Sequence, residues 1–173
     1  MAFISCTQVS KAIVDRGITA QMMIPQDANP AGQVHGGVVI KALDEAAGVV
    51  AIRHARSNVV TASIDRMDFL HPIFVGDLLF FKASLNLVGK TSMEIGVRVE
   101  SENLMSGKVR HVASAYLTYV ALDKQGKPRG VSPLILETEE DHRRNNEAKA
   151  RREMRLTAKR SEARCQKEPG TCK

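Results

Sequence analysis

The chain has 173 residues, of which 43% are hydrophobic and 25% are charged, as expected for a globular protein that can bury a core. It contains no Trp and only 4% aromatic residues, so stacking on nucleic-acid bases is not indicated. The net charge of +6 is divided equally between residues 1–136 and 137–173, which argues against a nucleic-acid-binding tail. No apolar run is long enough to span a bilayer.

The ends of the chain favour a cytoplasmic location. The N-terminus lacks a basic start followed by an apolar block, so we expect no signal peptide. The three cysteines, Cys6, Cys165 and Cys172, are few and odd in number, which predicts a reducing compartment and no disulfide framework. Neither of the last two has a His or Cys pair at metal-ligand spacing, so no metal site is expected.

The first half of the chain predicts one strand and one helix. Residues 18–24 alternate in polarity and predict a strand, and residues 25–32 form a loop rich in Pro, Asp and Asn. Gly36 and Gly37 then open a predicted helix that ends near Arg56. The many small residues of this helix allow neighbouring backbone to approach closely, as when a sheet wraps around it.

The second half predicts four strands. Residues 59–65 are rich in β-branched side chains, and residues 79–87 and 93–99 alternate on either side of a turn, which predicts an antiparallel hairpin with one buried face. Residues 113–119 continue the pattern. The predicted fold class is therefore α+β, with one long helix against an antiparallel sheet. A single helix leaves area that dimerisation would cover.

The composition changes near Glu137, where acidic residues precede basic ones in the order that suits a helix dipole. We therefore expect a main domain over residues 1–133, a charged helical extension over 134–164 and a flexible tail over 165–173. A solvated helix is the favoured interpretation of the extension, and a partner-binding element is the alternative.

A carboxylate amid the apolar surface of the first helix indicates chemistry. Asp44 lies seven residues after Gly37, and aspartate is seldom buried without a partner or a task. Backbone N–H groups at the helix start, this carboxylate and Asn29 in the preceding loop make a plausible hydrolytic site. The structural alternatives are a carboxylate held by an Arg or by backbone N–H groups, and an Asn that serves only its loop.

Sequence motifs in the same order as in a known family are spread along the chain: Pro25–Gly32, His35–Gly37, Leu43–Gly48, Ala51–His54, Val59–Asp65, Phe69 with Pro72, Val75–Asp77, Thr91–Glu94, Thr118–Ala121 and Leu136–Glu140. Together they resemble the hotdog-fold acyl-coenzyme A hydrolases, which include the cytosolic, brain-type enzyme of animals and its single-domain bacterial relatives. The similarity covers about residues 10–160, and the implied fold is a sheet wrapped around one central helix.

The resemblance implies a thioesterase that hydrolyses fatty acyl-coenzyme A without a cofactor or a serine nucleophile, with coenzyme A as part of the substrate. It implies Asp44 and Asn29 as catalytic residues, and we expect the N–H groups of Gly36 and Gly37 to stabilise the oxyanion. Asp44 would be a general base or, alternatively, a nucleophile that forms an anhydride. A non-catalytic acyl-coenzyme A sensor is the alternative function.

The animal enzyme builds its site from two hotdog domains, whereas this chain carries both residues in one. The resemblance therefore implies a homodimer with shared sites, assembled as a hexamer, that is, a trimer of dimers. Helix geometry agrees, because seven residues place Gly37 and Asp44 roughly 10 Å apart along the axis, which is too far for one helix to serve a single carbon.

Further residues are candidates for substrate contact. His35 either begins the helix or touches substrate. The turn at residues 89–92 resembles the end of a phosphate loop, but position 84 is Ser and the context is strand–turn–strand, so a nucleotide-triphosphate site is rejected. The candidates for binding substrate or coenzyme A are His35, Thr61, Gly89, Lys90, Thr91, Ser92 and Arg53, and other cations that the sequence does not rank against Arg53 are Arg66, Lys108, Arg110 and Arg129.

Overall fold

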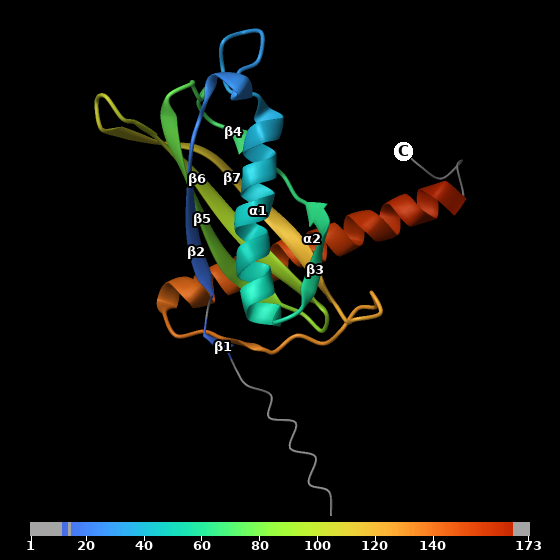
Figure 1. Cartoon of the computed structure of the whole chain (residues 1–173). Coiled ribbons are helices and arrows are strands. Elements are labelled where there is room, and N and C mark those ends of the chain that lie inside the picture. The colour runs from blue at the N-terminus through green and yellow to red at the C-terminus, as the bar shows by residue number, and fades with distance from the viewer. Residues whose placement is uncertain (1–11, 14, 168–173) are drawn as a thin grey trace, which may run out of the picture. The chain divides into compact units, whose positions relative to one another are not determined.

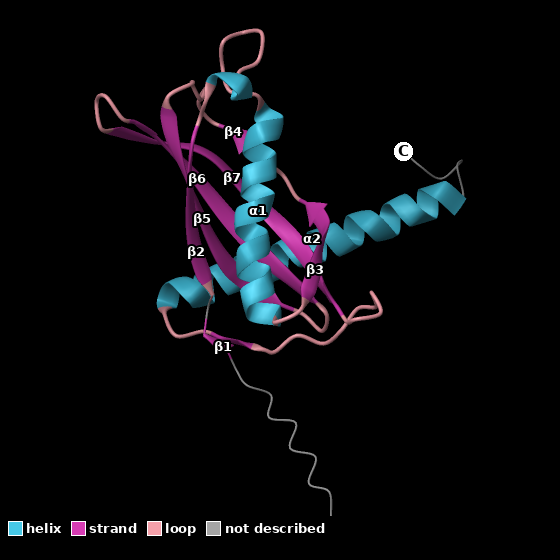
Figure 2. Cartoon of the chain, viewed as in Figure 1, coloured by secondary structure: helices cyan, strands magenta, loops and turns pink. Residues whose placement is uncertain are grey.

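The computed structural model describes residues 12–13 and 15–167. The chain divides into two compact units, one ending at Leu136 and the other beginning at Glu137, and each is described by itself. Figures 1 and 2 show the helices and strands of both. No helix in the described part has the length and hydropathy needed to cross a membrane.

The first unit is built around one long helix, α1 (Gly36–Ala55), and a curved antiparallel sheet (Figure 1). The sheet follows the order β2-β5-β6-β7-β3, with β4 pairing with β7 beyond the end of β3. The short strands β1 and β8 form a separate parallel pair. The strands are β1 (Ala12–Ile13), β2 (Arg16–Met22), β3 (Asn58–Ile64), β4 (Asp68–Phe69), β5 (Asp77–Val88), β6 (Ser92–Asn103), β7 (Lys108–Leu122) and β8 (Leu134–Ile135), and a 3-10 turn, η1 (Pro25–Asp27), follows β2.

This architecture confirms the α+β prediction, and every predicted strand is present. The structure adds β1, β4 and β8, which have two residues each and are too short to show a polarity pattern. Strand β2 lies at one edge of the sheet, and there Ile18 and Met22 are 67% and 52% exposed. Its alternation therefore marks a strand without marking a buried face.

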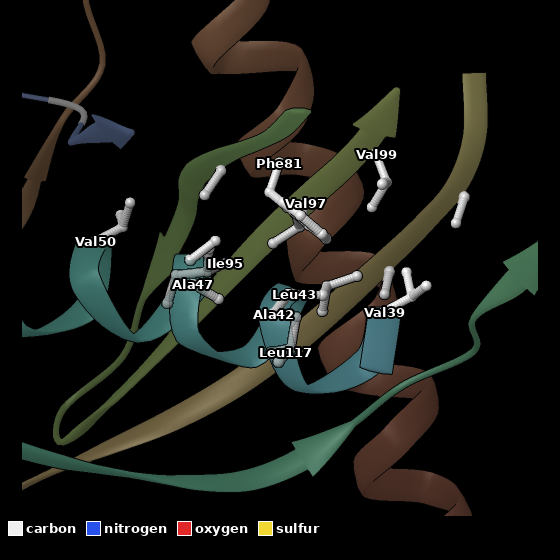
Figure 3. Packing of buried hydrophobic residues seen from close by; sticks show 14 of the residues in the cluster. Val39, Ala42, Leu43, Ala47, Val50, Phe81, Ile95, Val97, Val99 and Leu117 are labelled. Atoms are coloured by element: carbon white, nitrogen blue, oxygen red, sulfur yellow. The ribbon is translucent and has the colours of Figure 1, made fainter. Parts of the chain in front are cut away.

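The core lies between α1 and the inner face of the sheet (Figure 3). Val39, Leu43, Ala47 and Val50 recur at helical spacing, so they share one face of α1 and are fully buried. Burying a side chain such as Leu43 stabilises the fold by about 1.5–3 kcal/mol. The sheet side chains labelled in the same figure are Phe81, Ile95, Val97, Val99 and Leu117.

The C-terminal end of α1 is fixed by polar contacts. The backbone of Arg56 adopts a left-handed conformation (φ 50°), and its N–H donates to the Ile52 carbonyl oxygen. The buried ring of His54 has its Nδ1 atom 3.2 Å from a carboxylate oxygen of Asp15 and its Nε2 atom 2.9 Å from the Ser132 carbonyl oxygen. His54 therefore links the helix end to segments far away in the sequence, as a structural residue.

The second unit contains α2 (Glu139–Lys167), which continues three residues beyond the predicted end. Thr138 and Asp141 cap its start, since each backbone N–H donates to the other side chain at 3.1 Å. Ion pairs four residues apart, such as Arg144 with Glu140, line its exposed surface. Asp141 and Ala148 of α2 are buried, with exposed fractions of 5% and 0%.

Cys165 is disulfide-bonded, which contradicts the expectation of no disulfide framework at this residue. The other two cysteines and the end of the predicted flexible tail, residues 168–173, lie outside the described residues.

Candidate active site

The N-terminus of α1 presents two glycine N–H groups in different states. His35 is the N-cap, and its ring Nδ1 accepts a hydrogen bond from the Gly37 N–H at 3.0 Å. The Gly36 N–H has no acceptor among the described residues. Of the two glycines predicted to stabilise an oxyanion, Gly36 therefore has an available donor, whereas the Gly37 donor is engaged with the cap.

Asn29 organises the loop that precedes the helix. Its side-chain Oδ1 accepts hydrogen bonds from the N–H groups of Ala31 and Gln33, at 2.9 and 3.2 Å. The predicted loop function is therefore real. The Nδ2 amide makes no hydrogen bond within the described residues, so Asn29 keeps one polar group for another partner.

Asp44 lies two turns along α1 and is half-buried. Its Oδ1 atom accepts from the Thr61 hydroxyl at 2.8 Å and from the Tyr119 hydroxyl at 2.7 Å. No described residue donates to Oδ2. The carboxylate is thus held by two neutral hydroxyls, rather than by the Arg or the backbone N–H groups of the structural alternative, and one oxygen remains available to accept a proton.

The Tyr119 hydroxyl stays protonated. Burial raises its pKa well above the usual value of 10, and the hydrogen bond to Asp44 raises it further. Its proton serves two acceptors, Oδ1 and the backbone carbonyl oxygen of Asp44, which lies 2.8 Å away. Tyr119 is therefore a donor to this site and not an acid or a base.

An open hollow of about 430 Å³ adjoins the start of α1. Gly36 lies on its wall, and a Cβ atom at that position would come within 3.4 Å of the Phe69 ring. An extended ligand chain in this hollow would pass beside the available N–H. The other lining residues come from the two adjoining loops: Gln33, Val34, Leu70, His71, Pro72 and Ile73.

Two of the candidates for phosphate contact, Arg53 and the β5–β6 turn, lie at the opposite end of the helix, whereas Arg110 lies 3.5 Å from Asp77 at the start of β5. Strand β5 begins beside Met23, close to the loop before α1, and near its other end the Leu85 N–H donates to the carbonyl oxygen of Asp15, whose side chain contacts His54. The β5–β6 turn, residues 89–91, therefore lies towards the C-terminal end of α1, as Figure 1 shows. Arg53 lies there too, 3.4 Å from the Arg16 carbonyl oxygen.

One protomer thus brings together some of the predicted residues and separates others. Thr61, predicted to contact substrate, contacts Asp44. His35 and Gly36 lie at one end of the helix, and the turn containing Lys90 lies at the other. The sequence did not identify Tyr119 as a residue of this site. A signal existed, because a buried tyrosine needs a hydrogen-bond partner and so does an aspartate on an apolar helix face. No group of three or more His, Cys, Asp or Glu residues within the described ranges is placed to hold a metal ion.

Comparison with known proteins gives a consistent result. A family profile described as the Thioesterase superfamily matches residues 31–108. The cytosolic acyl coenzyme A thioester hydrolase of Mus musculus is 41% identical over 129 residues, which cover 73% of this chain and 34% of that protein. A Bacillus subtilis protein named as an uncharacterized acyl-CoA thioester hydrolase is 38% identical over 143 residues, which cover 83% of each chain. The chain spans about a third of the length of the first, mammalian relatives.

Solved structures are similar over nearly the whole chain. An apo-hexameric acyl-CoA thioesterase superposes with a TM-score of 0.80 at 41% identity, covering 83% of this chain and 92% of that one. An acyl-CoA hydrolase from Staphylococcus aureus, solved with butyryl coenzyme A, coenzyme A and coenzyme A disulfide, superposes with a TM-score of 0.80 at 34% identity, covering 91% and 96%. That hydrolase has also been solved with an Asp, an Asn or a Thr replaced by Ala.

The sheet wrapped around α1 is thus the hotdog fold that the resemblance implied. The identity and the coverage shared with the bacterial relative and with these structures extend far beyond the segment that the family profile matches. The chain belongs to the hotdog-fold thioesterase superfamily, among the acyl-CoA thioester hydrolases.

Proposed function

We propose that this protein is an acyl-CoA thioesterase that hydrolyses fatty acyl-CoA to a free fatty acid and coenzyme A. The observation that carries the proposal is the state of Asp44, whose Oδ1 is held by two hydroxyls while Oδ2 has no donor among the described residues. A general base needs such an oxygen. Asp, Asn and Thr, the residue types replaced in the S. aureus hydrolase, are also the types of Asp44, Asn29 and Thr61.

The proposed site is shared by two protomers. Gly36 and Asp44 are separated by eight residues of one helix, or roughly 12 Å along its axis, so they do not reach the same carbon from one chain. Two antiparallel helices facing each other across a dyad bring the start of one next to the carboxylate of the other. Hexameric relatives support a trimer of such dimers.

The exposed apolar surface supports this assembly. Strand β3 lies at the edge of the sheet opposite β2, and its Val60 and Ile64 are 46% and 42% exposed. Ile40 and Ile52 of α1 are exposed as well. An uncovered edge strand beside exposed apolar side chains is a surface that a soluble monomer avoids and a dimer buries.

The reaction follows from these groups. Asp44 Oδ2 takes a proton from water while the water oxygen bonds to the thioester carbonyl carbon, and the carbonyl oxygen becomes an oxyanion. The Gly36 N–H and the Asn29 amide stabilise that charge or orient the water. Collapse of the intermediate breaks the carbon–sulfur bond, and the thiolate leaves as coenzyme A and takes the proton back from Asp44. Water and protein groups suffice, so no cofactor is required.

Coenzyme A contacts come from both ends of the helix in this arrangement. His35 lies beside the two glycines at the start of the helix, and Thr61 lies beside Asp44. The dyad would bring Arg53 and the turn at residues 89–92 of the partner subunit, at the C-terminal end of its helix, towards the start of the first helix. The turn offers the Lys90 ammonium group and backbone N–H groups to phosphate. The cytosolic relatives support a cytoplasmic location.

The test is release of free thiol from acyl-CoA substrates of increasing chain length, with acyl-CoA binding measured by calorimetry. We expect the wild type to release thiol and Asp44→Ala to lose about 100- to 10,000-fold in kcat while it still binds substrate. Glu45→Ala, an exposed neighbour on the same helix, is the control and should keep full activity. A wild type that binds acyl-CoA without releasing thiol would contradict the proposal and favour the sensor.

A further inference from the structure

We propose that Tyr119 is a positioning residue of this site, which together with Thr61 fixes Oδ1 of Asp44 and thereby directs Oδ2 towards the reacting water. The inference rests on the proposed thioesterase function and assigns a residue to the same site.

The sheet register places the two hydroxyls together. Thr61 of β3 and Tyr119 of β7 are directly paired, so their side chains lie on the same face of the sheet. That face is the one that packs against α1, because Tyr119 is part of the buried core. Both hydroxyls then reach the same atom, Asp44 Oδ1, at 2.8 and 2.7 Å.

A second contact ties the ring to the helix backbone. The Tyr119 hydroxyl lies 2.8 Å from the Asp44 carbonyl oxygen, so the tyrosine contacts the backbone of the helix as well as the carboxylate. A Cβ atom at position 48, one turn later, would lie 3.8 Å from the hydroxyl oxygen, an ordinary van der Waals distance. The position of the ring is therefore defined by its hydrogen bonds to Asp44.

This arrangement resolves which oxygen acts as base. A free carboxylate rotates and exchanges its two oxygens, whereas two donors on one oxygen hold the other in a defined direction. Proton transfer needs the base within about 2.6–3.2 Å of the water oxygen. A carboxylate that rotates away from the water therefore no longer accepts its proton, even when the carboxylate stays charged. Because burial raises the pKa of Tyr119, this donor persists throughout the working pH range.

The test is Tyr119→Phe, which removes the hydroxyl and keeps the ring. We expect kcat for thiol release to fall about 10- to 100-fold, which corresponds to the loss of one hydrogen bond to a charged group, with KM within about twofold. The acid limb of the kcat/KM profile should move to higher pH, because the ionised carboxylate loses a donor. Thr61→Val should move the acid limb in the same direction, because it also removes a hydroxyl. Thr61→Ser keeps the hydroxyl and should leave the acid limb at its wild-type position.

Tyr116→Phe is the matched control. It makes the same change on the same strand, three positions away and therefore on the other face of the sheet, and should leave both kcat and the acid limb unchanged. A fall in melting temperature of Tyr119→Phe with an unchanged kcat and acid limb would overturn the inference and leave a structural tyrosine.

A crystal structure of Tyr119→Phe separates this inference from the proposed function. If the wild type releases no thiol, the proposed function fails, but the carboxylate of Asp44 can still be observed. A carboxylate that has rotated, or that adopts two conformations, supports the positioning role, and a carboxylate in the wild-type position overturns it.

Discussion

The Nδ1 atom of His35 lies 3.0 Å from the backbone nitrogen of Gly37, and this contact distinguishes the two glycines at the start of α1. The ring satisfies one of the helix's unpaired N–H groups and leaves that of Gly36 available. His35 thus has a structural function, the capping of α1, at a position next to the proposed oxyanion site.

Replacing His35 therefore tests the cap. We expect His35→Ala to lower the free energy of unfolding by about 1 kcal/mol, because a cap acceptor is lost, and His35→Asn to restore most of it, because Asn is a good N-cap residue. Thermal and urea unfolding at a fixed protein concentration measure the effect. His142→Ala, which removes an exposed histidine of α2, is the control and should leave the free energy of unfolding unchanged. Equal losses at both positions would show that the cap does not contribute to stability.

Two substitutions at Asn29 separate its two polar groups. Asn29→Asp keeps an acceptor for the N–H groups of Ala31 and Gln33 but removes the Nδ2 donor, whereas Asn29→Ala removes both. We expect both variants to lose on the order of 100-fold in kcat, the typical cost of a donor that serves the transition state. Only Asn29→Ala should also lose thermal stability. If Asn29→Asp keeps full turnover, the residue serves its loop alone.

Mixed oligomers test whether two chains build one site. We expect Asp44→Ala and Asn29→Asp subunits to have little activity as homo-oligomers, but a hybrid dimer has one site in which both residues are native. Random mixing by unfolding and refolding should recover about a quarter of wild-type thiol release, since half of the dimers are hybrids with one working site of two. No recovery, with hybrid formation shown by native mass spectrometry, would place both residues in a site within one chain.

Stability should depend on pH through Glu100. Its hydrogen bonds with Lys82 and then Arg98 hold the pKa of Glu100 below the ordinary 4.5. A carboxyl with a lowered folded-state pKa stabilises the fold above its unfolded-state pKa, and the stabilisation is lost as pH falls through the folded-state value.

Glu100→Gln should therefore lower the free energy of unfolding by about 1 kcal/mol at pH 7, a modest figure because both cations are about half exposed. The difference from wild type should shrink as the pH falls below 4.5 and through the lowered pKa of Glu100, because the side chain then becomes neutral. Melting temperatures at pH 7 and pH 3.5 measure it. Glu102→Gln, on the same strand and without an ion pair among the described residues, is the control and should show a smaller difference at pH 7.

Much of the fold follows from local patterns. The predicted helix of residues 36–56 is present as α1, because glycines open it and a left-handed Arg56 ends it. The alternating residues 79–87 and 93–99 form β5 and β6 because their apolar side chains pack on one face. The exposure of Ile18 was not predictable from alternation, which reports a strand but not its place at a sheet edge.

The site was predictable only in part. Asp44 and Asn29 stand out by residue type and by resemblance. The contact of Tyr119 with Asp44 joins residues 75 positions apart, and it depends on the pairing of β3 with β7, which no local pattern specifies. The engagement of the Gly37 N–H depends on the rotamer of His35, which a sequence does not contain.

The register of β3 against β7 shifts after Thr61, because Ala62 has no counterpart on the neighbouring strand. Thr61 faces Tyr119, whereas Ile64, beyond the irregularity, faces Leu117. The two halves of β3 are therefore out of phase with each other. One inserted residue thus lets the first half of the strand hold Thr61 opposite Tyr119, while the later half follows its own register along the sheet edge.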